Sequence, residues 1–141
     1  AVRFVRAGGS GNHNSTGISQ ELNKDISDAG SLRLRLDVRL HYQSLSGGGY
    51  LASEFPLMVR INYKDIYGSQ TFWVKSFYYQ NDAGNPTISG EQIGRDQWFP
   101  YESPDLLTSV SPRPATILSI QIYASGWDYD SMVSDVSLFV E

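Results

Sequence analysis

Residues 31–42 show a clear alternation of apolar and polar side chains. Every second residue is apolar, and the positions between carry Arg, Asp or His. A helix would scatter the apolar side chains around its circumference, whereas a strand places all of them on one face. The stretch therefore predicts a long strand at the centre of a sheet, with these apolar residues facing the core: Leu32, Leu34, Leu36, Val38, Leu40 and Tyr42.

Shorter stretches of the same kind predict further strands, separated by polar loops rich in glycine or proline. They are residues 2–6, 17–22, 57–63, 70–79, 96–101, 117–124 and 134–140. Both faces of 70–79 are rich in β-forming residues, so the pattern does not say whether Trp73 and Lys75 face the core. Residues 8–16 are too polar and glycine-rich to pack, which indicates a loop.

About eight strands without a sustained helical period predict an all-β fold. The long loops favour a two-sheet antiparallel β-sandwich, a jelly roll, over residues 1–141 as one domain. The alternative is an immunoglobulin-like sandwich, although its Cys–Trp–Cys pattern is missing and the loops here are longer.

Composition narrows the classes of function. The net charge of −4 argues against a general nucleic-acid binder, which would be basic. The chain has no cysteine, which excludes disulfides and thiolate metal sites. It also has no apolar run of the length that spans a bilayer, so no membrane insertion is expected in this segment.

The polar face of the central sheet is the first candidate site. If strands 31–42 and 57–63 are neighbours, one surface carries Arg33, Arg35, Arg39, His41, Arg60 and Asn62, joined by Gln121 and Tyr123 from strand 117–124. Planar aromatics stack on sugar rings and guanidinium groups pair bidentately with carboxylates, so such a surface favours a glycan, and an acidic one over a neutral one. The alternative is a solvated face neutralised by Asp37 and other carboxylates, or one covered by a loop.

Aromatic side chains in the loops are the second candidate site. The set is Trp98, Phe99, Tyr101, Trp127 and Tyr129. Exposed rings would form a platform for a sugar or a protein partner. The alternative is that the rings plug the ends of the sandwich, which we favour for Trp98 and Phe99. Both interpretations stay open for Trp127 and Tyr129, because the loop around them is polar.

Three short motifs carry a family resemblance. They are GISQEL at 17–22, SLRLRLDV at 31–38 and SDVSLFV at 134–140. Together they resemble galactose-binding-like jelly-roll modules, especially carbohydrate-binding modules, whose chains end in D-D-V-S-L; here Ser134 replaces the first acidic residue. The chain is also similar to extracytoplasmic sandwich domains of bacterial envelope regulators. The resemblance implies a jelly roll in an extracellular or bacterial cell-envelope protein, with a glycan as ligand.

Structural calcium is a further expectation from the resemblance, because related sandwiches often hold calcium near their termini. Asp128, Asp130 and Asp135 would supply oxygen ligands. These three aspartates lack the fixed spacing of a dedicated calcium loop, and calcium needs six to eight oxygens.

Taken together, the sequence predicts a non-catalytic carbohydrate-binding module, with the glycan on the polar sheet face or on loop aromatics. The alternative is a structural or interaction domain that packs against other domains of a parent protein or against copies of itself. An edge strand such as 2–6 would mediate this by pairing with another chain. A glycosidase is the third hypothesis, with little support, because no acidic pair stands out and no hydrolase motif occurs.

Overall fold

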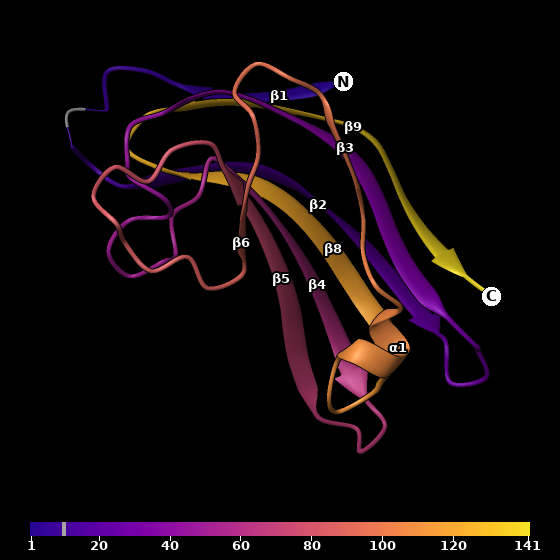
Figure 1. Cartoon of the computed structure of the whole chain (residues 1–141). Helices are drawn as coiled ribbons and strands as arrows, with labels where there is room; N and C mark the ends of the chain where they lie inside the picture. The colour runs from indigo at the N-terminus through magenta and orange to yellow at the C-terminus, as the bar shows by residue number, and fades with distance from the viewer. Residues whose placement is uncertain (10) are drawn as a thin grey trace.

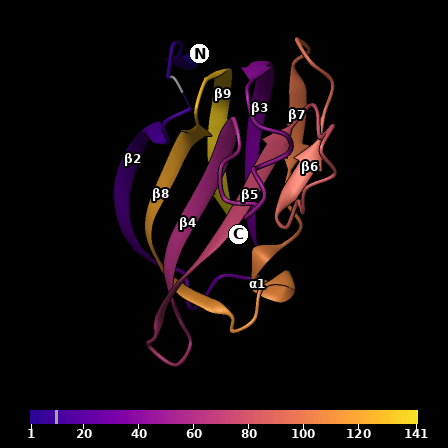
Figure 2. The same cartoon turned by 90° about the vertical axis from the view of Figure 1, so that its left-hand side faces the viewer.

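The alternating stretches of the sequence form strands that pair into two sheets (Figures 1 and 2). The structure, a computed structural model, describes residues 1–9 and 11–141. Its strands are β1 (Val2–Arg6), β2 (Asn14–Asp25), β3 (Leu32–Gln43), β4 (Leu57–Asp65), β5 (Gln70–Tyr78), β6 (Gly90–Gln92), β7 (Phe99–Glu102), β8 (Pro114–Gly126) and β9 (Tyr129–Val140). One short helix, α1 (Leu106–Ser109), lies between β7 and β8.

The strand order is that of a jelly roll. The four-stranded sheet runs β1-β9-β3-β7 and the five-stranded sheet runs β2-β8-β4-β5-β6. All neighbours are antiparallel except the short β6, which is parallel to β5. The predicted all-β sandwich is confirmed. The immunoglobulin-like alternative is wrong, since that fold keeps its first two strands in one sheet, whereas β1 and β2 lie in different sheets here.

The core lies between the two sheets and is built from the apolar faces of the long strands. On β3, the residues from Leu32 to Leu40 alternate between buried and more accessible positions, as predicted. Tyr42 departs from the prediction and is exposed. The register with β9 shifts between Leu40 and Tyr42, which turns Gln43 inward instead.

Pairing with β4 settles which face of β5 is buried. Trp73, Lys75 and Phe77 lie opposite Ile61, Val59 and Leu57, the inward-facing residues of β4. Lys75 therefore points toward the interior near the sheet edge, where its ammonium group pairs with Glu91 at 2.9 Å. The opposite side of β5 forms part of the outer face of the five-stranded sheet.

Strand β2 begins within the stretch that was interpreted as a loop. It starts at Asn14 rather than Gly17, and nearly all of its side chains are exposed. A polar sequence can form this strand because β2 is an edge strand, held by its backbone ladder with β8. Helix α1 was not predicted either, since four residues are too few to show a helical period. The described part of the chain has no helix long and apolar enough to cross a membrane.

Candidate functional site

The predicted polar surface is divided between the two sheets. Strands β3 and β4 are not neighbours, because β3 lies in the four-stranded sheet and β4 in the five-stranded sheet. The outer face of the four-stranded sheet carries Arg33, Arg35, Arg39 and His41. The outer face of the five-stranded sheet carries Arg60, Asn62, Gln121 and Tyr123. The expectation of one shared surface is therefore wrong, since the two sets lie on opposite sides of the sandwich.

Carboxylates neutralise the outer face of the four-stranded sheet. Ion pairs join Arg3 to Asp130 and Arg35 to Glu102, and the His41 ring forms a hydrogen bond with Asp96. Arg3 is bidentate, with Nε and Nη2 donating to the two oxygens of Asp130 at 2.9 and 2.6 Å. This hydrogen bonding lowers the pKa of Asp130. The alternative interpretation, a face neutralised by Asp37 and other carboxylates, fits this side of the molecule through Asp130 and Glu102.

The remaining basic residues of this face lie near the same acidic groups. Arg39 lines a shallow depression with His41 and Asp96. A hydrogen bond with the His41 ring lowers the pKa of Asp96, and the charge of Arg39 adds to the effect. Arg33 reaches the Ser103 carbonyl through Nη1 at 3.5 Å. Every arginine of β3 thus has an acidic or carbonyl group in its surroundings.

Arg60 has a different environment on the outer face of the five-stranded sheet. Its guanidinium lies over the Phe72 ring, with Cζ 3.8 Å from the ring centroid. Its Nε donates to Asn62 Oδ1 at 2.9 Å. Within the described residues no carboxylate forms an ion pair with Arg60. The cation is therefore held in place by a ring and a neutral amide, and its charge is not compensated.

Neighbouring strands fix the groups around Arg60. Asn62 Nδ2 donates to Ser119 Oγ at 2.9 Å, so the amide that holds Arg60 is itself held. Gln121 lies directly opposite Arg60 on β8. Burial raises the pKa of Tyr123, although the charge of Arg60 acts against the shift, so the phenol keeps its proton at neutral pH.

A shallow depression joins these residues across β2, β8 and β4. Its volume is about 360 Å³, and its lining residues are Ser15, Gly17, Ile18, Ser19, Arg60, Gln121 and Tyr123. The strands of this sheet curve so that its outer face is concave (Figure 1). Gly17 is required here, because a Cβ atom on it would lie 2.4 Å from Tyr123 Cβ. Gly17, Ser19 and Phe72 were not predicted as site residues, because their place depends on the β2–β8 and β4–β5 registers.

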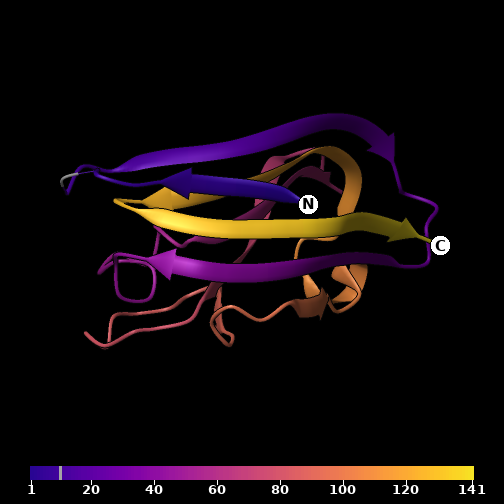
Figure 3. The same cartoon turned by 90° about the horizontal axis from the view of Figure 1, so that it is seen from above.

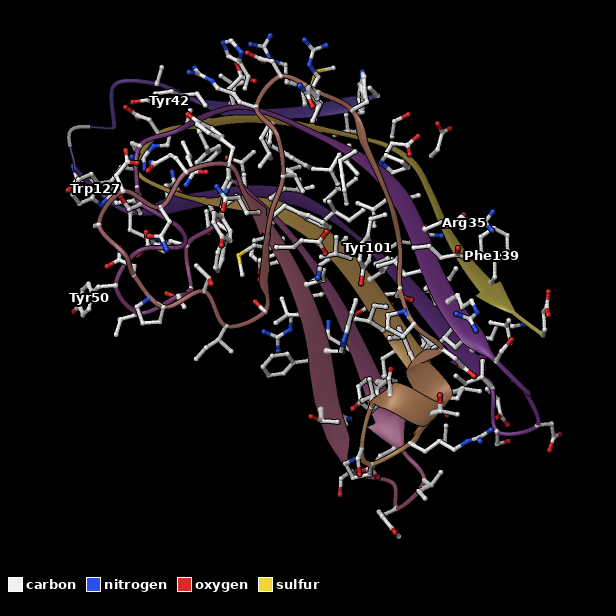
Figure 4. All side chains as sticks on the ribbon, viewed as in Figure 1. Arg35, Tyr42, Tyr50, Tyr101, Trp127 and Phe139 are labelled. Carbon is white, nitrogen blue, oxygen red and sulfur yellow. The ribbon has the colours of Figure 1, made fainter. Side chains whose placement is uncertain are left out.

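The loop aromatics also divide into exposed and buried rings. Trp127 is 42% exposed at one end of the sandwich, the end where Tyr50 lies as well (Figure 4). Tyr129 is only 1% exposed, and its hydroxyl lies 2.6 Å from Thr16 Oγ1. Tyr129 is therefore not part of an exposed aromatic platform for a ligand, because its ring is buried at the end of the core. Tyr50 was not predicted as a site residue, because its loop shows no alternation of apolar and polar residues and is marked only by the preceding glycines.

The rings that precede β8 show the same division. Phe99 and Tyr101 pack against the core, with ring centroids 6.2 and 5.4 Å from that of Phe77. The plugging interpretation thus holds for Phe99. Trp98 is exposed, contrary to expectation, because it precedes the first residue of β7 and lies outside the ladder with β3.

The three aspartates predicted as calcium ligands do not converge. Asp128 Oδ1 accepts a hydrogen bond from the Gly9 amide at 2.8 Å, and Asp130 pairs with Arg3. Asp135 lies five residues beyond Asp130 on β9, roughly 16 Å away along an extended strand. The described residues contain no group of three His, Asp or Glu side chains able to hold a metal ion.

Comparison with known proteins places the chain in no established family. No family model matches it, and no curated protein matches it. Among solved structures it is similar to an exo-β-agarase, with a TM-score of 0.48 and 11% sequence identity. The similarity covers 99% of this chain but only 20% of the agarase chain. The chain therefore spans about a fifth of the protein to which it is similar.

Proposed function

We propose that the chain is a non-catalytic carbohydrate-binding module, and that the concave face of the five-stranded sheet binds the glycan. The observation that carries the proposal is the uncompensated guanidinium of Arg60, fixed by Phe72 and Asn62. A guanidinium that is already oriented loses little conformational freedom when it binds a carboxylate through two parallel hydrogen bonds. We therefore assign an acidic sugar, such as a uronic acid, as the preferred ligand.

The other groups of the depression suit the hydroxyls and the ring of a sugar. Tyr123 offers an aromatic edge and a protonated phenol, and the Gln121 amide both donates and accepts. Ser19 adds a hydroxyl from the opposite rim of the depression. The volume of about 360 Å³ lies at the lower end of the range for small-molecule sites, about 300–1,000 Å³. This proposal places the domain in an extracellular or cell-envelope protein.

A second candidate position is the end of the sandwich, where Trp127 and Tyr50 are both exposed. Aromatic rings on loops stack on sugars without any need for charge. This position favours a neutral glycan, whereas the Arg60 face favours an acidic one. The two positions are therefore distinguished by ligand charge and by mutation.

A glycan array containing neutral, uronic and sulfated chains tests the proposal, followed by titration of the best ligand. We expect binding to uronic chains, and Arg60→Ala should weaken it by about tenfold or more, since a hydrogen bond to a charged group contributes about 1.5–3 kcal/mol. Arg35→Ala is the matched control, because Arg35 also stacks on a phenylalanine, Phe139, but pairs with Glu102 on the opposite face (Figure 4).

The controls separate the possible outcomes. Equal loss of affinity in the Arg60 and Arg35 variants would contradict the proposed position. Loss in Trp127→Ala with no loss in Arg60→Ala would move the site to the end of the sandwich. An array with no binding to any chain would overturn the carbohydrate proposal. Repeating the screen with EDTA tests for a metal held by ligands other than the three aspartates.

A further inference from the structure

The face that carries Arg60 holds a second cation, Lys64, four residues further along β4. Strand β4 pairs with β5 without a register shift from Leu57 to Lys64, so alternate side chains stay on one face of the sheet. Lys64 therefore points outward together with Arg60 and Asn62, and it is exposed. We call Arg60, Asn62 and Lys64 the outer row of β4.

Lys64, like Arg60, lacks an acidic partner. Among the described residues it forms no ion pair. Its neighbours across the two ladders are Gln70 on β5 and Thr116 on β8, which are both uncharged. The adjacent Asp65 is buried and accepts hydrogen bonds from the amides of the following turn. The outer row thus carries two cations without a carboxylate beside either of them.

On the side of β8, the first acidic residues belong to β2, the edge strand of this sheet and the outermost strand in Figure 3. Glu21 lies opposite Ser119 of β8, and Asp25 lies opposite Thr116. Both acidic residues are therefore two strands away from β4, roughly 10 Å at about 4.8 Å per strand. This separation is comparable to the Debye length at physiological ionic strength. The charges of the sheet thus favour an anionic chain that lies along β4 and disfavour one that crosses β2.

The Phe72 ring lies beside the middle of the outer row, directly opposite Asn62. The guanidinium of Arg60 covers part of this ring, yet Phe72 is still 49% exposed. The remaining surface of the ring is available for a sugar to stack on. In the other direction along β4 the face is closed, because Met58, the next outward residue, is only 6% exposed. A chain held at Arg60 therefore continues toward Lys64.

We propose that the ligand of this face is a linear polyanionic glycan, bound along β4 through at least two charged sugar units. This inference rests on the glycan site proposed above. Arg60 and Lys64 are four residues apart, roughly 13 Å at about 3.3 Å per residue, so one carboxylate does not contact both cations. Arg60 would bind one carboxylate through two parallel hydrogen bonds. Lys64, a point charge on a flexible stem, would pair with the carboxylate of a later unit.

Galacturonic acid and its linear hexamer test the proposal by NMR titration of the 141-residue protein. We expect the hexamer to bind more tightly than the single sugar, and the fully methyl-esterified hexamer, which has the same length but no charge, to bind more weakly than the acidic one. Lys64→Gln should weaken binding of the hexamer by about two- to fivefold, the range for an exposed ion pair, and leave binding of the single sugar unchanged. A hexamer also offers more carboxylates to Arg60 alone, so the gain from single sugar to hexamer is compared between the wild-type protein and the variant.

Lys24→Gln is the matched control for this test. It removes the same charge, but Lys24 lies opposite the core residue Ile117 and is therefore on the other side of the sheet. Equal effects of the two glutamine variants, or an equal gain with chain length in the wild-type and Lys64→Gln proteins, would overturn the proposal and leave the Arg60 site intact. An absence of binding by both the single sugar and the hexamer would instead reject the acidic-glycan site on which the proposal rests.

Discussion

Arg35 and Arg60 show how the same residue acquires different chemistry on the two faces of the sandwich. Each guanidinium stacks on a phenylalanine ring, with Cζ 4.8 Å from Phe139 and 3.8 Å from Phe72 respectively. Arg35 also pairs with Glu102, which comes from the neighbouring strand β7. Arg60 has neighbours that are neutral, and its charge remains available to a ligand. The difference arises from the strands next to each arginine, not from the arginine itself.

Tyr101 makes the stability of the protein sensitive to alkaline pH. Burial raises the pKa of Tyr101 to about 12, and the charge of Glu91 adds to the shift. In the unfolded chain the phenol ionises at about 10, so between pH 10 and 12 the unfolded state loses a proton that the folded state keeps. The stabilisation is fully present below pH 10 and is lost as the pH rises toward 12.

We therefore expect Tyr101→Phe to reduce the loss of stability at high pH. Urea unfolding at pH 8 and pH 11 measures the free energy of unfolding of both proteins. The decrease between these pH values should be smaller in the variant, by on the order of 1 kcal/mol, since each pKa unit corresponds to about 1.4 kcal/mol. Equal decreases in the two proteins would show that Tyr101 does not carry the effect, leaving Tyr63 and Tyr123, whose pKa values are also raised by burial.

At the scale of the elements, β1 is held mainly by one side chain. Phe4 is buried, whereas Val2 and Val5 are exposed. We expect Phe4→Ala to lower the free energy of unfolding by about 3–5 kcal/mol and to release β1 from β9. Hydrogen exchange in residues 129–133 should then become faster, because β1 pairs with this part of β9.

Val5→Ala is the control for this prediction, since a change at an exposed position away from special contacts alters stability by no more than about 0.5 kcal/mol. Unchanged exchange in residues 129–133 of the Phe4→Ala protein would contradict the central role of Phe4.

The strands that sequence reasoning predicted best are those buried on one face. Strand β3 was predicted to within one residue at each end because its apolar side chains alternate without interruption from Leu32 to Leu40. The edge strand β2 was predicted too short, since exposure on both faces leaves no alternation in Asn14–Asp25. The three-residue strand β6 and the four-residue helix α1 were missed because such short elements show no period.

The candidate site was predicted only in part, for a physical reason. Alternation fixes which residues of a strand face outward, and it correctly placed Arg60, Asn62, Gln121 and Tyr123 on one face. It does not fix which sheet a strand joins, so Arg33, Arg35 and Arg39 were assigned to the same surface. The long connection between β3 and β4 crosses from one sheet to the other, and nothing in its sequence indicates that crossing.

At the scale of the whole molecule, the last two strands hold both sheets together. Strand β9 lies between β1 and β3, and β8 lies between β2 and β4. We expect a chain truncated after Gly126, which lacks β9, to lose cooperative thermal unfolding and the dispersed NMR spectrum of a folded protein. Removal of residues 1–6 is the matched control, because β1 is an edge strand, and this chain should remain folded with reduced stability. A folded protein without β9 would contradict this account of the architecture.

The central position of β8 and β9 also determines when the protein folds during its synthesis. Synthesis runs toward the C-terminus, and among the described residues only β3–β7 and β4–β5–β6 have their partners before Pro114 has emerged. Domains fold as units, so this one remains open until its final strands arrive. Because most of residues 1–141 emerge before either sheet can close, the folded sandwich forms only after β8 and β9 have followed.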